Sequence, residues 1–362
     1  MAQLLTLEPN CKFAILALHN VRADVPTDLI LQDGTRVLSS FPFSLENHWK
    51  DWLGTIQFNR LKNCNLFFIR TATEGWPTGH LQIFGGPIDE DLQSHTGRVF
   101  GMLRLLGAIN YQDAFMLGGH VVNGESECRQ FTSLERFYIT LGCLPLMIRE
   151  NDLRTAVELH ETYLHLRRTY TDTSKWRFSR GLAALKAAFE QHNAYDRLPG
   201  FVRALEALIL PAQGDTTRQF ISRCALFAGP KLNETAIKEA LQEAYKMRCD
   251  LEHMHDWDRS LGKYQVAERE AIMLWRTRQM EELASAAYRK TLSDGALQPN
   301  FQNDSAIEEF WKKPDDEIRT AFGNVCNISQ LKNVKIDPYG WADTSEWTPE
   351  QIENFCRKTK SA

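Results

Sequence analysis

No apolar run in this 362-residue chain approaches the length of a membrane-spanning helix. A membrane span needs about 20 apolar residues, whereas the run at residues 13–18 stops after six. The first eight residues also lack the basic start of a secretory signal. We therefore expect a cytoplasmic protein with no membrane partner.

Paired cysteines are missing as well, although the chain contains eight cysteines. They stand singly and form no Cys-x-x-Cys pair, which argues against a disulfide framework and against a thiolate zinc site. We expect reduced, mostly buried thiols.

The chain also lacks an excess of basic charge, since 42 Lys and Arg residues face 46 Asp and Glu residues for a net charge of −4. Nucleic-acid binding through a broad basic surface is therefore disfavoured, and any RNA or DNA binding must come from a local site. Glycine-rich phosphate loops are absent too, which disfavours dehydrogenases and nucleotide triphosphatases. We interpret Gly85-Gly-Pro and Gly118-Gly-His120 as turns.

The first 150 residues carry mixed strand and helix signals. Asp33-Gly34 separates two β-prone runs, which predicts a hairpin with a type I′ turn. Leu45, Trp49, Trp52 and Ile56 are spaced to share one buried face of a helix. Further strands are predicted at residues 65–71, 81–84 and 114–117, and a helix is predicted between the last two, with Leu92, Val99, Met102 and Leu106 inward.

After residue 152 the pattern is helical. Apolar residues recur three and four positions apart, which predicts helices at residues 156–170, 178–189, 198–210, 216–227, 234–254 and 263–292. The predicted fold class is therefore α+β. A mixed α/β domain (residues 1–151) precedes a helical bundle (152–295), and an irregular extension (296–362) wraps the bundle, with a short helix starting at Thr348.

The feature that points most directly to function is Arg248. On the predicted helix at residues 234–254, Ile237, Leu241 and Ala244 form an apolar stripe whose next position is 248. Arg248 therefore falls on the face that should be buried, where a guanidinium needs a carboxylate, a phosphate or the mouth of a cleft.

His253 and His255 follow closely. On a continuous helix His255 would share the face of Arg248, whereas His253 would lie about 140° away. A site that joins Arg248 to His253 requires the helix to end near Glu252, or a second subunit. Arginine binds phosphate and histidine transfers protons near neutral pH, so the pair suits metal-free phosphodiester cleavage.

Two other interpretations of this stretch remain open. Arg248 could pair with Glu252 one turn along the helix or with Glu206 on another helix, as a purely structural ion pair. Alternatively, the oxygen and nitrogen donors there could hold Zn²⁺ or Mn²⁺, through Asp250, His253, His255 and Asp256. The other histidines are interpreted as surface or satisfied core residues.

Residues 176–292 resemble the HEPN superfamily of helical-bundle domains, particularly the ApeA-like branch found in bacterial conflict and phage-defence proteins. That superfamily is marked by an Arg, four to six residues and a His near the end of a bundle helix, which Arg248 with His253 or His255 matches. Tyr245 before the motif matches too, as do the segments at residues 201–208 and 220–226. Cys249 departs from the polar residue usual after the motif arginine.

The resemblance implies a homodimer whose two Arg/His motifs face each other, and a metal-independent endoribonuclease of toxin or antiviral type that leaves a 2′,3′-cyclic phosphate. Arg248 would contact phosphate and His253 or His255 would be the acid–base, without a cofactor. The supporting residues would be Glu206, Arg223, Asp250 and Glu252. RNA would be the partner, and residues 1–151 would receive a trigger. The alternative is a non-catalytic HEPN-type module that binds RNA or nucleotides.

Overall fold

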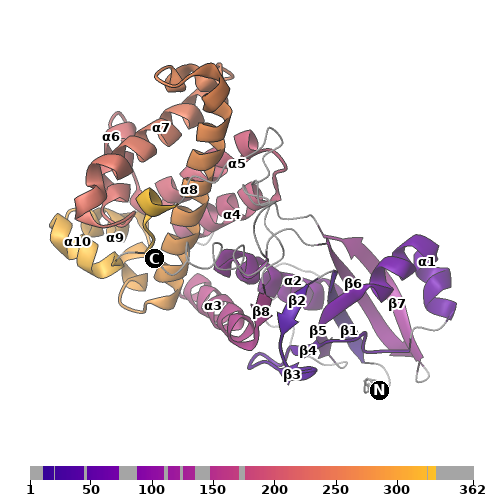
Figure 1. The fold of residues 1–362 in the computed structure, drawn as a ribbon. Coiled ribbons are helices and arrows are strands. Elements are labelled where there is room, and N and C mark those ends of the chain that lie inside the picture. Colours follow the sequence, from indigo (N-terminus) through magenta and orange to yellow (C-terminus); the bar gives the residue numbers. More distant parts are fainter. Residues whose placement is uncertain are drawn as a thin grey trace. The chain divides into compact units, whose positions relative to one another are not determined.

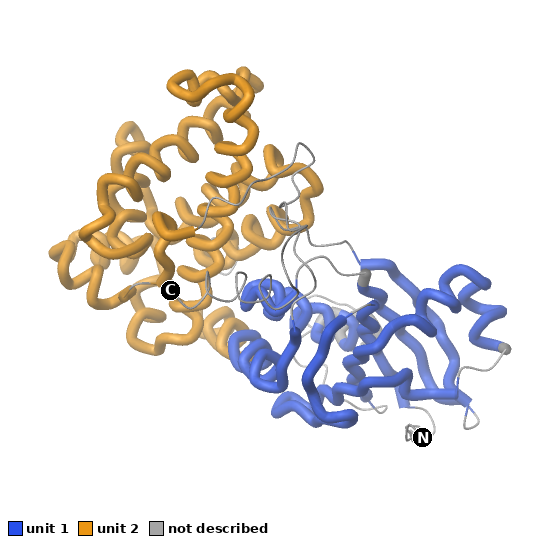
Figure 2. Tube along the Cα trace, viewed as in Figure 1, with its two compact units in different colours: residues 1–137, 145–160 blue, residues 138–144, 161–362 orange. Residues whose placement is uncertain are grey.

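The chain folds into two compact units, seen in a computed structural model (Figure 2). Unit 1 comprises residues 1–137 and 145–160, and unit 2 comprises residues 138–144 and 161–362. The structure describes residues 11–19, 21–44, 47–72, 88–109, 113–122, 125–134, 147–170, 176–323 and 325–331.

A six-stranded antiparallel sheet forms the centre of unit 1, in the order β3-β4-β5-β1-β6-β7 (Figure 1). Its strands are β1 (Lys12–His19), β3 (Asp28–Ile30), β4 (Arg36–Leu38), β5 (Cys64–Ala72), β6 (Asp113–Val122) and β7 (Glu125–Ser133). A separate parallel pair joins β2 (Arg22–Asp24) to β8 (Met147–Arg149). The strands predicted at residues 65–71 and 114–117 are confirmed, and the one at 81–84 lies outside the described residues.

Helices cover both faces of this sheet. Phe13 and Ile15 of β1 share a core cluster with Trp49 of α1 (Asn47–Lys62). On the opposite face, Gly97 of α2 (Ile88–Leu106) lies against Met116 of β6. Because both faces are covered, the central strand β1 is apolar and buried from residue 13 to residue 18, without alternation.

Helix α1 corrects the predicted packing of its aromatic residues. Trp49 is fully buried, but Trp52 is 43% exposed and Ile56 is 76% exposed. Gly54 interrupts the helix at φ 74° and ψ 161°, a conformation open to glycine, so the residues around it do not keep one helical phase. Leu45 lies outside the described residues.

The predicted hairpin forms, but its turn differs from the predicted one. Strands β3 and β4 pair antiparallel with Ile30 opposite Arg36, so the loop is longer than a two-residue turn. A type I′ turn needs a positive φ at both central residues, but in this loop only Gly34 has one. The Asp33 side chain accepts hydrogen bonds from the Thr35 N–H and from the Thr35 hydroxyl. The partly buried ion pair between Arg70 and Asp33 (2.7 Å) holds this loop onto the sheet.

The segment Gly118-Gly-His120 is strand rather than turn. Both glycines lie within β6, at an irregularity in its pairing with β7. A Cβ on Gly119 would lie 2.1 Å from the Glu127 carbonyl oxygen and 2.5 Å from the Phe13 ring, so close packing explains the glycine there. The Gly85 segment lies outside the described residues.

The helices predicted after residue 152 are confirmed, with ends shifted by a few residues. Helix α3 (Glu150–Thr169) belongs partly to each unit, because the units divide between residues 160 and 161. The boundary predicted between residues 151 and 152 lies in the first turn of this helix. The following helices, with α8 as the long one in Figure 1, are α4 (Arg177–Glu190), α5 (Ala194–Ile209), α6 (Thr216–Ala225), α7 (Glu234–Glu252) and α8 (Val266–Ser293).

Small residues let α4 approach α5 closely. A Cβ on Gly200 of α5 would lie 2.7 Å from the Ala188 Cβ of α4, and a Cβ on Gly181 of α4 would lie 2.5 Å from the Ala207 Cβ of α5. These pairs run in opposite directions along the two helices, so α4 and α5 are antiparallel. The buried Tyr288 of α8 donates a hydrogen bond to the Ala204 carbonyl oxygen of α5 and packs against Phe178 of α4, with ring centroids 4.9 Å apart.

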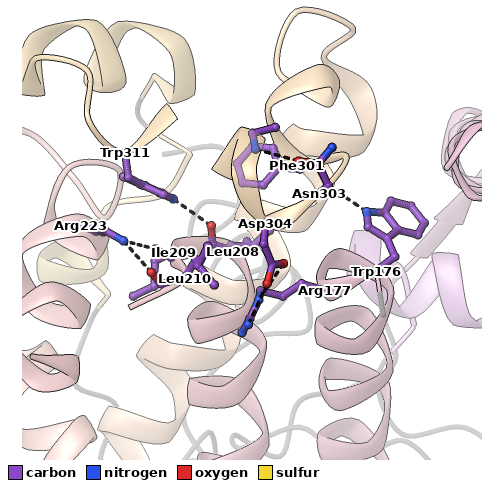
Figure 3. Close-up of polar contacts among 11 residues, drawn as sticks. Trp176, Arg177, Leu208, Ile209, Leu210, Arg223, Phe301, Asn303, Asp304 and Trp311 are labelled. Atoms are coloured by element: carbon purple, nitrogen blue, oxygen red, sulfur yellow. Dashed lines mark hydrogen bonds and ion pairs between the residues drawn. The ribbon is translucent and has the colours of Figure 1, made fainter. Parts of the chain in front are cut away.

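The predicted irregular extension is partly wrong, because residues 297–331 contain helical segments that complete the core of unit 2. These are η3 (Gln298–Phe301), α9 (Asp304–Phe310), α10 (Asp315–Phe322) and η4 (Ile328–Gln330). Two buried indoles anchor the segment: Trp311 donates to the Leu208 carbonyl oxygen (3.0 Å), and Trp176 donates to that of Phe301 (2.8 Å) (Figure 3). The helix predicted at Thr348 lies outside the described residues.

Within the described ranges, no helix is both long and apolar enough to cross a membrane. Six cysteines are free thiols there, four of them buried. The prediction that the scattered histidines are either exposed or hydrogen-bonded in the core is wrong for His160. It is fully buried, and neither of its ring nitrogens has a hydrogen-bond partner in the described part of the chain.

Candidate functional site

Arg248 lies half-buried on α7, between two carboxylates. Its Nη2 is 3.1 Å from Oε2 of Glu206 on α5, and its Nε is 2.8 Å from Oε2 of Glu252, one turn further along α7. The guanidinium also lies over the Tyr245 ring, 5.5 Å from its centroid, and the Tyr245 hydroxyl donates to Glu206. Both partners that the structural interpretation of Arg248 named are therefore present.

The Glu252 carboxylate also binds a second arginine. Arg203 of α5 donates from Nε to Oε1 of Glu252 at 2.8 Å, while Oε2 of Glu252 faces Arg248. Glu252 thus bridges two guanidiniums, one with each oxygen. The sequence analysis did not name Arg203. A signal was present, because Arg203 precedes Glu206 by three residues and therefore lies on the same face of α5 as Glu206.

Burial and charge act in opposite directions on this cluster. Burial raises the pKa of Glu206 above its ordinary value, although Arg248 and Tyr245 oppose the shift. Burial lowers the pKa of Arg248, but Glu206 and Glu252 outweigh it, and the net shift is upward. Arg248 is therefore a permanent cation with a fixed orientation.

Helix α7 ends at Glu252, as a site that joins Arg248 to His253 requires. His253 is the C-cap, Met254 adopts a left-handed conformation (φ 55°), and the His255 N–H donates to the Asp250 carbonyl oxygen at 2.8 Å. The Met254 N–H donates to the Leu251 carbonyl oxygen, which completes a Schellman motif. The sharp reversal leaves both imidazoles exposed, with ring centroids 6.1 Å apart.

The structure therefore brings together Arg248, Glu206 and Glu252, with His253 and His255 at the adjoining helix end. Arg223 has a different role. Its Nη1 donates to the carbonyl oxygens of Ile209 and Leu210, and its guanidinium lies 5.7 Å from the centroid of Trp311 (Figure 3). It caps the C-terminus of α5, where Leu210 takes a left-handed conformation.

The metal-binding interpretation has no support in the described ranges. No group of three or more His, Cys, Asp or Glu side chains there is arranged to hold a metal ion. Asp250 contributes its backbone carbonyl to the helix end, as described above.

The arrangement offers two chemical capabilities. Two guanidiniums hold the two oxygens of one carboxylate, and guanidiniums so placed can bind an anion with charge-assisted hydrogen bonds. Two exposed imidazoles at the end of the same helix can donate or accept protons near neutral pH. Together these are the parts that a phosphodiester-cleaving site needs.

Comparison of this chain with family models, with curated proteins and with solved structures gave no match.

Proposed function

We propose that this protein is a metal-independent endoribonuclease whose site lies at the C-terminal end of α7. One observation carries the proposal: a guanidinium held rigidly on a half-buried helix face, four residues before a helix end that presents two exposed histidines. A half-buried cation on the helix turn before two exposed proton-transfer groups is an arrangement typical of catalytic sites.

The reaction would be an internal transesterification. The ribose 2′-oxygen attacks the adjacent phosphorus, the bond from phosphorus to the 5′-oxygen breaks, and the products are a 2′,3′-cyclic phosphate and a 5′-hydroxyl. One imidazole takes the proton from the 2′-hydroxyl, and a second, protonated, supplies one to the leaving 5′-oxygen. Arg248 would stabilise the additional negative charge on the phosphoryl oxygens. The step consumes no water and needs no metal or cofactor.

The two imidazoles could come from one chain or from two. In a HEPN-like homodimer the second copy would bring its own Arg248 and histidines to the same phosphate. Unit 1 would receive the trigger, a ligand or a protein, and an RNA substrate would place the protein in the cytoplasm. Light scattering of the purified protein tests the dimer.

A labelled mixture of RNAs, incubated with EDTA present, tests the activity. Wild type is compared with Arg248→Ala, His253→Ala and His255→Ala, and with Lys246→Ala as a matched control because Lys246 is an exposed cation on the same helix. We expect loss of cleavage in Arg248→Ala by about a hundredfold or more, loss in at least one histidine variant, and no change in the control. Cleavage that survives in all three site variants would contradict the proposal.

The second candidate function is a non-catalytic RNA-binding module. The observation that favours it is that Glu206 and Glu252 neutralise Arg248 in the free protein, so the guanidinium has a structural role without any substrate. Wild-type protein that binds RNA but leaves it intact, with and without candidate triggers, would favour this function.

A further inference from the structure

The Glu252 carboxylate is held in an electrostatically unfavourable position. It is the last residue of α7, where unpaired carbonyl groups give a helix end its partial negative charge. Arg248 also precedes Glu252 in the sequence, and this order is the weaker one for ion pairs four residues apart. The two arginines, rather than the helix, keep the carboxylate in place.

The cluster is open to solvent on one side. Arg203 is 59% exposed, whereas Arg248 and Glu252 are 18% and 19% exposed. The Glu206 carboxylate is 17% exposed and is fixed by the Tyr245 hydroxyl, so it stays with Arg248. Glu252 is the carboxylate that can leave by a side-chain rotation, because it is at the helix end and its second partner is a surface arginine.

A phosphodiester has the geometry to take the place of this carboxylate. Each has two terminal oxygens that share negative charge, and Glu252 directs one oxygen to Arg203 and the other to Arg248. Two guanidiniums and two carboxylates leave the cluster neutral. When Glu252 moves out, the cluster gains one positive charge for the incoming phosphate.

We propose that Arg203 and Arg248 together bind one phosphodiester group of RNA, and that the Glu252 carboxylate occupies this anion site in the free protein. Arg203 is then a second phosphate contact, and Glu252 is an internal competitor that lowers the affinity for RNA. This inference rests on the proposed function for its choice of RNA as the ligand.

Binding of an uncleavable RNA tests the inference without requiring catalysis. The probe is a fluorescein-labelled oligoribonucleotide with 2′-O-methyl groups throughout, which removes the attacking hydroxyl, and the readout is fluorescence anisotropy over a salt series. The proteins are wild type, Glu252→Gln, Arg203→Ala and the double variant. The matched control is Glu239→Gln, which removes the same charge from an exposed position on the same helix.

We expect Glu252→Gln to tighten binding about three- to tenfold, because a charge-assisted competitor is removed. The slope of log affinity against log salt concentration should steepen by about 0.7, as for one additional phosphate contact. Glu239→Gln should change the affinity less than about twofold. Arg203→Ala should weaken binding. The gain from Glu252→Gln should be smaller in the Arg203→Ala background, where Arg248 alone is left to bind the phosphate.

Equal or weaker binding by a folded Glu252→Gln protein would overturn the inference and leave the ribonuclease proposal standing. If that variant does not fold, unchanged binding by Arg203→Ala overturns the inference by itself. Tighter binding by Glu252→Gln without cleavage by any variant would support the inference while the ribonuclease proposal fails. No binding by any of the proteins would overturn both.

Discussion

Arg276 of α8 and Glu243 of α7 form a buried ion pair, with Nη2 of Arg276 2.7 Å from Oε2 of Glu243 and both side chains less than a tenth exposed. Lys263 and the Tyr264 hydroxyl bind the other oxygen of Glu243, at 2.6 Å and 3.0 Å. Although burial raises the pKa of Glu243, Lys263 and Arg276 lower it below its ordinary value. This carboxylate therefore joins α7 to α8 and to the loop before α8.

Removing the charge of Glu243 should destabilise the protein strongly. In Glu243→Gln the Arg276 guanidinium stays buried without its counter-charge, so we expect a loss of about 3–5 kcal/mol in the free energy of unfolding. Urea denaturation measures it, with Glu158→Gln, at an exposed position on α3, as the control. A double change, Glu243→Gln with Arg276→Met, should recover part of the loss, and a single variant as stable as the control would contradict the prediction.

Replacement of Met254 by glycine should stabilise the protein. Met254 lies at the left-handed position of the Schellman motif, 92% exposed, where a Cβ is unfavourable and no packing compensates. Met254→Gly should therefore raise the free energy of unfolding by about 0.5–1 kcal/mol. Lys246→Gly, in the interior of the same helix, should instead lower it by about 1 kcal/mol. Thermal denaturation of both variants distinguishes the two effects, and a Met254→Gly variant less stable than wild type would refute this account of the helix end.

His160 should make the protein less stable in acid. Burial lowers its pKa to about 3, and the nearby His95, Arg98 and Arg70 add to the shift. The folded state therefore stays neutral at His160 while the unfolded state takes up a proton below about pH 6.5, so stability is full above that pH and decreases toward pH 3. The decrease from this residue should approach about 1.4 kcal/mol per pH unit.

The measurement is the free energy of unfolding between pH 7 and pH 4. His160→Leu should flatten the dependence, whereas His165→Gln, at an exposed position on the same helix, should leave the slope as in wild type. Identical slopes for wild type and His160→Leu would show that other groups cause the acid sensitivity.

Two helical glycines should respond in opposite ways to alanine. Gly200→Ala places a methyl group 2.7 Å from the Ala188 Cβ, so we expect a loss of about 1–3 kcal/mol as α4 and α5 are forced apart. Gly101→Ala on α2 meets no atom within 4 Å and should gain about 0.5–1 kcal/mol. Calorimetry on the two variants checks the signs, and similar effects from both would mean that packing at Gly200 does not limit the helix spacing.

The helices of unit 2 could be predicted from the sequence because each keeps an apolar stripe at helical spacing. The end of α7 was harder to place, since the stop depends on a left-handed Met254, and methionine gives no local signal for that conformation. The interruption of α1 at Gly54 could not be predicted for a related reason. The spacing of Trp49, Trp52 and Ile56 fits one continuous helix, and only the positive φ of Gly54 shows that the helix is interrupted.

In the candidate site, Glu206 and Glu252 could be named as partners of Arg248 because one lies a turn away and the other on a plausible neighbouring helix. Arg203 lies one turn before Glu206, but the sequence does not show that it meets Glu252, because only the packing of α5 against α7 joins these two residues. The role of Arg223 likewise depends on carbonyl groups at the end of α5, which carry no side-chain pattern.

The ion pairs between α5 and α7 show that these two helices run antiparallel. Glu206 faces Arg248 and Arg203 faces Glu252, so residue numbers decrease along α5 as they increase along α7. Because each residue advances a helix by about 100°, deletion of a single residue between Arg248 and Glu252 would rotate the helix end and present His253 to Arg203 in place of the carboxylate. The number of residues between Arg248 and the end of α7 therefore determines which side chain meets Arg203.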